Sequence, residues 1–246
     1  MRNRISRGLV LRAAAIAGGV LVCDWALLCF PQPFFHTSVQ AKNLTLYSDQ
    51  SFPPEAGRRV LEAVEAKLAA SPLYSIHDQH AAFVCNSRWR QRLFFNRNYG
   101  VGGLNQYPLT TNVFLREAVI EDDRLISPSG NQVHGDRTLD YFIAHEITHT
   151  LTVRAIGWLA YYRLPQWVRE GYADYVGKGL PFDYEAARRS FIAGAPEMDW
   201  QQSGLYTRYH LLVAYLLDKQ HLTVQQLLES PPDRTAVENQ IRESAK

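Results

Sequence analysis

A chain of 246 residues with an apolar fraction of 46% can bury one substantial core, and a charged fraction of 20% excludes a largely disordered protein. The formal net charge is only +2, which gives no basis for binding nucleic acid. We therefore expect mainly one globular domain and no nucleic-acid partner.

The N-terminus combines a basic cluster with an apolar run. The cluster consists of Arg2, Arg4, Arg7 and Arg12. The apolar run covers 9–30 and is interrupted only by Arg12 and Asp24. Basic residues ahead of an apolar run of this length are typical of a membrane anchor whose N-terminus is cytoplasmic. We therefore predict a cytoplasmic N-terminus over 1–8, a single-pass transmembrane signal anchor over 9–30 and a linker over 31–42.

This arrangement puts the main domain, 43–246, on the periplasmic or extracytoplasmic side of the cytoplasmic (inner) membrane. A cleaved signal peptide is an alternative, since "VQA" at 39–41 has the small residues that a signal peptidase prefers. That site lies far beyond the apolar run, which favours the anchor. A hydrophobic helix of a soluble protein is a third interpretation.

The first half of the main domain is predicted to mix strands and helices. Alternating or β-branched patterns predict strands over 43–49, 81–87 and 111–120. Helical spacing of apolar residues predicts helices over 53–71 and 88–95. Turn-forming residues predict loops over 101–110 and 127–136.

From Arg137 onward the pattern becomes helical. Helices are predicted over 137–153, 155–163, 165–177, 183–193, 205–219 and 222–229. Asp136 is expected to cap the first of them. Strands followed by helices predict an α+β domain.

The stretch "HEITH" contains His145, Glu146 and His149. On a helix, residues four apart lie on one face, so the two imidazoles can bind one Zn²⁺. Glu146 projects to the side of that pair, where a carboxylate can take a proton from water activated by the metal. The flanking apolar residues predict a buried helix, in which polar side chains need a reason to be present.

A catalytic zinc site needs a third protein ligand. The helix predicted over 165–177 offers Glu170 and, on the same face, Asp174. Glu170 can supply the third ligand, and Asp174 can accept the free N–H of a ligating histidine. The alternative is that both carboxylates form a solvated acidic face, although the neighbouring residues are apolar and aromatic.

The spacing of these residues, together with the phrase "LPQWVREGYADY" (164–175), resembles the gluzincin branch of zinc metallopeptidases. It is particularly similar to compact, membrane-anchored bacterial peptidase-like domains. The resemblance implies a zincin-like fold, with His145, His149 and Glu170 as ligands and Glu146 as general base. Asp174 would then be the outer partner of His145.

The same resemblance implies a tyrosine that stabilises the oxyanion of the reaction. Tyr206 fits that position best and Tyr209 is the alternative, while a core aromatic stripe remains a further interpretation of both. The strand predicted over 111–120 would, by analogy, be the edge strand that pairs with an extended peptide. The chain lacks the Gly-x-Met-Glu-Asn stretch of the related aminopeptidases, so the resemblance does not imply exopeptidase activity.

The sequence thus leads to the hypothesis of a membrane-anchored zinc metallohydrolase, a peptidase acting on peptides or proteins. The alternative is a catalytically silent zincin-like binding or scaffold protein on the membrane. A domain without metal, in which the motif is a coincidence, is the third interpretation.

Overall fold

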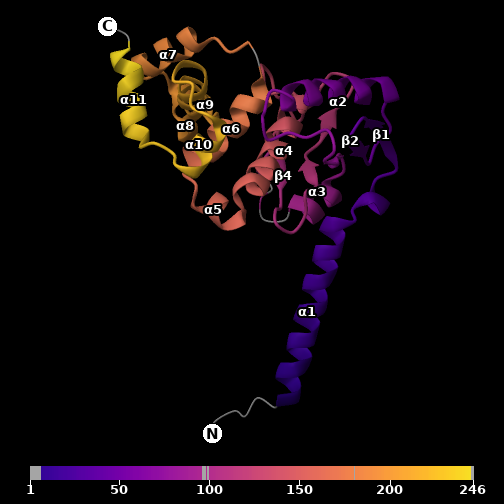
Figure 1. The fold of residues 1–246 in the computed structure, drawn as a ribbon. Coiled ribbons are helices and arrows are strands. Elements are labelled where there is room, and N and C mark those ends of the chain that lie inside the picture. The colour runs from indigo at the N-terminus through magenta and orange to yellow at the C-terminus, as the bar shows by residue number, and fades with distance from the viewer. Residues whose placement is uncertain (1–6, 96–97, 99, 180, 245–246) are drawn as a thin grey trace.

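The computed structural model describes residues 7–95, 98, 100–179 and 181–244. Figure 1 shows a rounded α+β domain from which one long helix projects. Arg2 and Arg4 of the basic cluster lie outside the described residues.

The projecting helix is α1, Arg7–Cys29. Its segment Val10–Cys29 is long and apolar enough to cross a membrane, a test that a signal sequence passes as well. The C-terminal end of α1 is attached to the domain: the Asn112 side-chain amide donates to the Leu28 carbonyl at 2.8 Å. Leu28 itself is buried. The end of the apolar helix therefore belongs to the folded domain.

The domain is built on a five-stranded sheet in the order β1-β2-β3-β5-β4. The strands are β1 (Thr37–Ala41), β2 (Leu44–Ser48), β3 (His80–Val84), β4 (Gly103–Asn105) and β5 (Val113–Leu115). β2, β3 and β5 are parallel, and the outer strands β1 and β4 run antiparallel to their neighbours. A small hairpin, β6 (Ala118–Val119) and β7 (Arg124–Leu125), follows.

Side chains of the central strands alternate between two cores, as the pleat requires. On β3, Ala82 and Val84 face the larger core, which also contains helix α2 (Pro54–Leu68) and the helices of the second half. Phe83 faces the smaller core on the other side, with Phe114 of β5 and Phe94 of helix α3 (Arg88–Phe95). Leu28 of α1 belongs to this smaller core. Both faces of the parallel strands are therefore covered, as is usual for such sheets.

The predicted linker over 31–42 was wrong in part. It contains a 3₁₀ turn, Gln32–Phe34, and the whole of strand β1. Val39 of β1 pairs with Leu46 and is buried in the larger core. The alternation of "TSVQA" is too short to distinguish a strand from an extended linker, so only the pairing with β2 defines it.

The strand predicted over 111–120 also differs from the observed one. It is divided into β5 and β6, and β5 lies inside the sheet rather than at its edge. On this side of the sheet the edge strand is β4, which falls within the loop predicted over 101–110. The glycines of this segment indicate a turn by composition, yet they permit close approach of the backbone to a neighbouring helix.

The second half is helical, as predicted. It comprises α4 (Leu139–Ile156), α5 (Trp158–Arg163), α6 (Gln166–Lys178), α7 (Tyr184–Ala193), α8 (Trp200–Ser203), α9 (Thr207–Ala214), a π-helical turn (Tyr215–Lys219), α10 (Val224–Glu229) and α11 (Arg234–Glu243). Helices α8 and α11 were not predicted. In Figure 1, α4 lies beside the sheet and α6 to α11 form a separate layer beyond it.

Candidate metal centre

Helix α4 carries the His-Glu-x-x-His stretch through the middle of the domain. Thr138, not the expected Asp136, caps it, and the Thr138 side chain accepts from the Tyr141 N–H. Asp136 instead forms an ion pair with Lys178 at 3.0 Å. Leu139, Ile143, Ile147 and Leu151 of this helix are buried in the larger core, as the sequence predicted.

Helix α6 brings the third candidate ligand. It packs between α4 and α9 because small residues allow the backbones to approach closely. A Cβ added to Gly171 would lie 2.6 Å from the Tyr209 carbonyl oxygen of α9. One residue earlier, the Glu170 side chain points at α4 and is 18% exposed. Asp174 is 1% exposed, so the two carboxylates do not form a solvated acidic face.

The three candidate ligands converge. Nε2 of His145 lies 3.5 Å from Oε2 of Glu170, and Nε2 of His149 lies 3.6 Å from the same oxygen. All three donor atoms lie within 4.8 Å of one another. Tetrahedral zinc with bonds of 2.0–2.1 Å holds its ligands roughly 3.3–3.4 Å apart. The donor set and its spacing therefore fit one metal ion.

Tyrosine hydroxyls lie against the outer nitrogens of both histidines. Tyr161 Oη of α5 lies 3.0 Å from Nδ1 of His149, and Tyr141 Oη lies 3.5 Å from Nδ1 of His145. The Tyr141 hydroxyl donates to Asp174 at 2.6 Å. Asp174 was expected to contact His145 directly, but here it is linked to that histidine through Tyr141.

The other oxygen of Asp174 faces positive or polar groups. Oδ2 lies 3.1 Å from Nδ1 of the buried His210 and 3.4 Å from Nζ of Lys178. Burial alone would raise the pKa of Asp174, but the His210 hydrogen bond and the Lys178 charge hold it well below its usual range. Asp174 is thus a buried carboxylate shared by three elements of the helical half.

The surroundings of His149 and Glu170 favour the protonation states in which these two side chains can bind a metal, namely a neutral imidazole and an ionised carboxylate. Burial, only partly offset by Glu170, lowers the pKa of His149 to about 4. Burial opposes ionisation of Glu170, yet the two histidines outweigh it and lower the pKa of Glu170 to about 2. Near neutral pH His149 is neutral and Glu170 is ionised. For His145, burial lowers the pKa, but Glu170 and Glu146 outweigh burial and raise it, which works against metal binding.

Glu146 lies beside the three ligands, against the edge strand. A Cβ on Gly103 of β4 would lie 2.7 Å from Glu146 Cγ, so only glycine leaves room for this side chain. The Asn105 backbone N–H donates to Glu146, but burial dominates and raises the pKa of Glu146 to about 7. A carboxyl group with such a pKa can accept and release a proton near neutral pH.

The two candidate tyrosines differ in position. Tyr206, at the start of α9, stacks on the His145 ring with centroids 6.0 Å apart, and its hydroxyl bonds to Glu170. Tyr209 stacks behind Tyr206 and is buried. Of the two, Tyr206 lines the cleft described next.

A cleft of about 950 Å³ opens onto the three ligands and Glu146. Strand β4 and the side chains of Tyr161, Tyr162 and Tyr206 are among its lining. Arg137 and Arg169 also line it, and their guanidinium groups lie over the rings of Phe142 and Tyr161, respectively. A separate groove of about 750 Å³ beside α5 and α10 is lined neither by the three candidate ligands nor by Glu146.

Comparison with protein-family models and with curated proteins gave no match. The site therefore has to be interpreted from its own geometry. Sequence reasoning identified the three converging ligands but missed Tyr141, Tyr161 and β4. No spacing rule connects Tyr161 to His149, because α5 turns back on α4 through Gly157, whose φ is +80°.

Proposed function

We propose that this protein is a zinc-dependent hydrolase of zincin-like fold that cleaves peptide bonds. The observation that carries the proposal is the meeting of His145, His149 and Glu170 around one point, with the half-buried Glu146 beside them. Resemblance of the same residues to the gluzincin pattern supports it.

Glu146 supports a catalytic rather than a purely structural site. A structural zinc site is closed by four protein ligands, whereas the cluster found among the described residues has three and opens onto a cleft. A carboxyl group that is partly removed from water without being a ligand costs stability, and a scaffold has no reason to retain such a group. This distinction disfavours the silent binding protein.

The chain's own residues account for most of the chemistry. A bound zinc ion supplies a Lewis acid that polarises the substrate carbonyl and lowers the pKa of water toward neutrality. Glu146 takes a proton from the attacking water as its oxygen adds to the carbonyl carbon. Glu146 then returns that proton to the leaving nitrogen as the C–N bond breaks. The Tyr206 hydroxyl donates to the oxygen that becomes negative.

Strand β4 is suited to hold an extended peptide. It is the last strand of the sheet and also lines the cleft. A peptide that added to this edge would place its backbone beside Glu146. The expected strand over 111–120 cannot take this role, because β5 is paired on both sides.

We further propose that α1 spans the cytoplasmic membrane with its N-terminus inside and the domain outside. The apolar segment Val10–Cys29 and the arginines before it support this orientation. The integration of Leu28 into the smaller core supports an uncleaved helix.

The test uses the full-length protein purified in detergent, because removal of residues before 42 would remove β1. We expect about one zinc per chain, lost in Glu170→Ala and retained in the exposed control Glu229→Ala. We expect Glu146→Gln to keep zinc and to lose hydrolysis of a peptide library. Zinc without any hydrolysis by the wild type would favour the scaffold protein, and absence of zinc from the wild type after loading would refute the metal site.

A further inference from the structure

The domain exposes an apolar and aromatic surface around the place where α1 emerges. We define this basal surface by six side chains: Phe30, Trp89, Leu109, Trp158, Leu159 and Tyr162. Each is between 48% and 64% exposed. Exposed aromatic residues of this size cost little singly, but a contiguous group marks an interaction surface.

Short contacts connect these residues to the end of α1. The Cys29 thiol donates to the Leu109 carbonyl at 3.1 Å. Farther along, the Tyr162 hydroxyl donates to the Tyr107 carbonyl at 3.0 Å, which joins α5 to the same loop. On the other side, the Trp89 ring lies 6.2 Å from that of Phe34, just after α1. These contacts place the residues of the basal surface on two sides of the end of α1.

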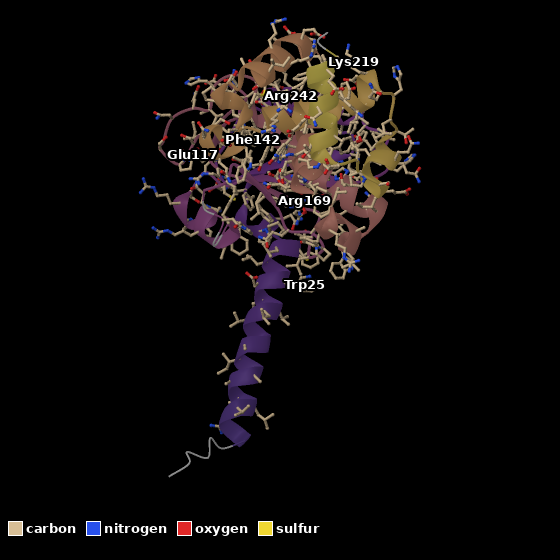
Figure 2. The ribbon with its side chains drawn as sticks, turned by 90° about the vertical axis from the view of Figure 1, so that its left-hand side faces the viewer. Trp25, Glu117, Phe142, Arg169, Lys219 and Arg242 are labelled. Atoms are coloured by element: carbon tan, nitrogen blue, oxygen red, sulfur yellow. The ribbon has the colours of Figure 1, made fainter. Side chains whose placement is uncertain are left out.

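Helix α5, Trp158–Arg163, is unusual in that none of its six residues is buried. Its sequence "WLAYYR" is nevertheless almost entirely apolar or aromatic. Figure 1 shows α5 and α3 on the side of the domain from which α1 leaves, and Figure 2 shows the same side after a quarter turn, with Trp25 just below the domain. The apolar side chains of α5 would gain stability if an apolar environment outside the domain covered them.

The charges of the surrounding segments indicate which medium. No Asp or Glu occurs from Gln79 to Arg116, and none from Ile147 to Arg169, although the chain contains 24 acidic residues. The exposed basic residues Arg88, Arg92 and Arg163 lie in these segments. Glu229 of α10 lines the groove beside α5, but the two segments themselves contribute Trp, Tyr and Arg and no carboxylate. Such a composition is typical of protein surfaces at the interface of an anionic bilayer.

We propose that the basal surface lies in the headgroup layer of the membrane, with the Trp158–Tyr162 face of α5 inserted at the acyl boundary. The proposal rests on the proposed transmembrane course of α1. The occupant is the bilayer itself rather than a protein partner, because the basal surface adjoins the end of α1, a helix that is long enough to span a bilayer. Tyr107 and Tyr162 also line the cleft, so one end of the cleft adjoins the membrane surface.

Nitroxide labels on the full-length chain test this placement in vesicles of phosphatidylethanolamine and phosphatidylglycerol. Leu159→Cys reports on α5. Ile192→Cys on α7 is the matched control, because Ile192 is 50% exposed and Leu159 is 48% exposed, and α7 lies far from α1. Leu21→Cys reports on α1. Cys23→Ala and Cys29→Ser remove the accessible native thiols, and the buried Cys85 stays.

The measurement compares collision of each label with oxygen, which enters lipid, and with a nickel chelate, which stays in water. We expect the oxygen-to-nickel ratio to be several-fold higher at Leu159 than at Ile192. Equal ratios at these two positions, with a lipid-like ratio at Leu21, would overturn the basal surface alone. A water-like ratio at Leu21 would overturn the anchoring and the basal surface with it.

Discussion

The hydroxyl oxygen of Tyr161 lies 3.0 Å from Nδ1 of His149, although the two residues come from different helices. When Nδ1 carries the proton and donates to this oxygen, the lone pair of Nε2 faces Glu170. We therefore expect Tyr161→Phe to weaken zinc binding by about 10- to 100-fold. Competition with a chelator measures the change. Tyr162→Phe, the exposed neighbour, is the control, and equal affinities in both variants would refute the role of Tyr161.

Tyr206 and Tyr209 are expected to differ in their effect on catalysis, because Tyr206 lines the cleft and Tyr209 lies behind it. Tyr206→Phe removes a donor beside His145 and is expected to lower kcat by roughly 10²- to 10³-fold with zinc retained. Tyr209→Phe removes a hydroxyl behind that ring, and we expect kcat to remain within about twofold of wild type. Steady-state hydrolysis of a peptide substrate measures both. A loss in Tyr209→Phe alone would reverse the assignment.

Asp174 is expected to contribute mainly to stability. It is 1% exposed and faces Tyr141, His210 and Lys178. Because Asp174→Asn leaves the Lys178 charge without its partner and weakens the buried hydrogen bonds to Tyr141 and His210, the free energy of unfolding should fall by about 3–5 kcal/mol. Asp218→Asn on the surface should change it by under about 0.5 kcal/mol. Urea unfolding followed by near-UV circular dichroism compares them, and similar midpoints would contradict the expectation.

Because His80 at the start of β3 is buried, we expect the stability of the fold to decrease at acidic pH. His80 is 4% exposed, and burial lowers its pKa from 6.5 to about 4. Between these values the unfolded chain binds a proton that the folded chain does not. Stability is therefore lost as pH falls from about 6.5 to about 4, by at most about 3 kcal/mol from this group.

His80→Phe, which keeps a ring beside Tyr74, should remove that part of the acid loss. Thermal unfolding at a series of pH values measures it, with the exposed His77→Phe as control. An unchanged slope of stability with pH in His80→Phe would show that other groups cause the acid sensitivity.

Strand β1 restricts where the chain can be processed. Cleavage after Ala41 would remove all of β1, which pairs with β2 and buries Val39. We expect the mature protein to retain residues 37–41, and intact-mass measurement on protein from membranes checks this. A mature chain starting at Lys42 would contradict the fold of the sheet.

The sequence alone predicted the parts of the site that depend on local periodicity. His145 and His149 share a helix face by their spacing, and Glu170 lies on an apolar helix that had to pack against another one. Asp174 was correctly placed on that helix, but its contact with Tyr141 depends on how α4 and α6 cross. Crossing geometry is set by many packed side chains and cannot be derived from either helix alone.

The edge strand could not be predicted for a related reason. β4 consists of Gly103, Leu104 and Asn105, and its glycine argues for a turn when only propensity is considered. The strand exists because its partner β5 lies opposite and because Glu146 occupies the space that a side chain at Gly103 would fill. Both causes are distant in the sequence.

The hydrogen bond from the Asn112 amide to the Leu28 carbonyl attaches the end of α1 directly to the domain, and Leu28 is packed into the smaller core. An enzyme on a flexible linker samples a volume set by the length of that linker. Here the residues that follow α1 are instead packed in the smaller core and paired in strand β1. For a chain anchored by α1, the cleft would be carried at one constant height above the bilayer. The enzyme would then search for substrate only by lateral diffusion in the plane of the membrane. It would reach only those peptide bonds that lie at the same height above the bilayer as the cleft.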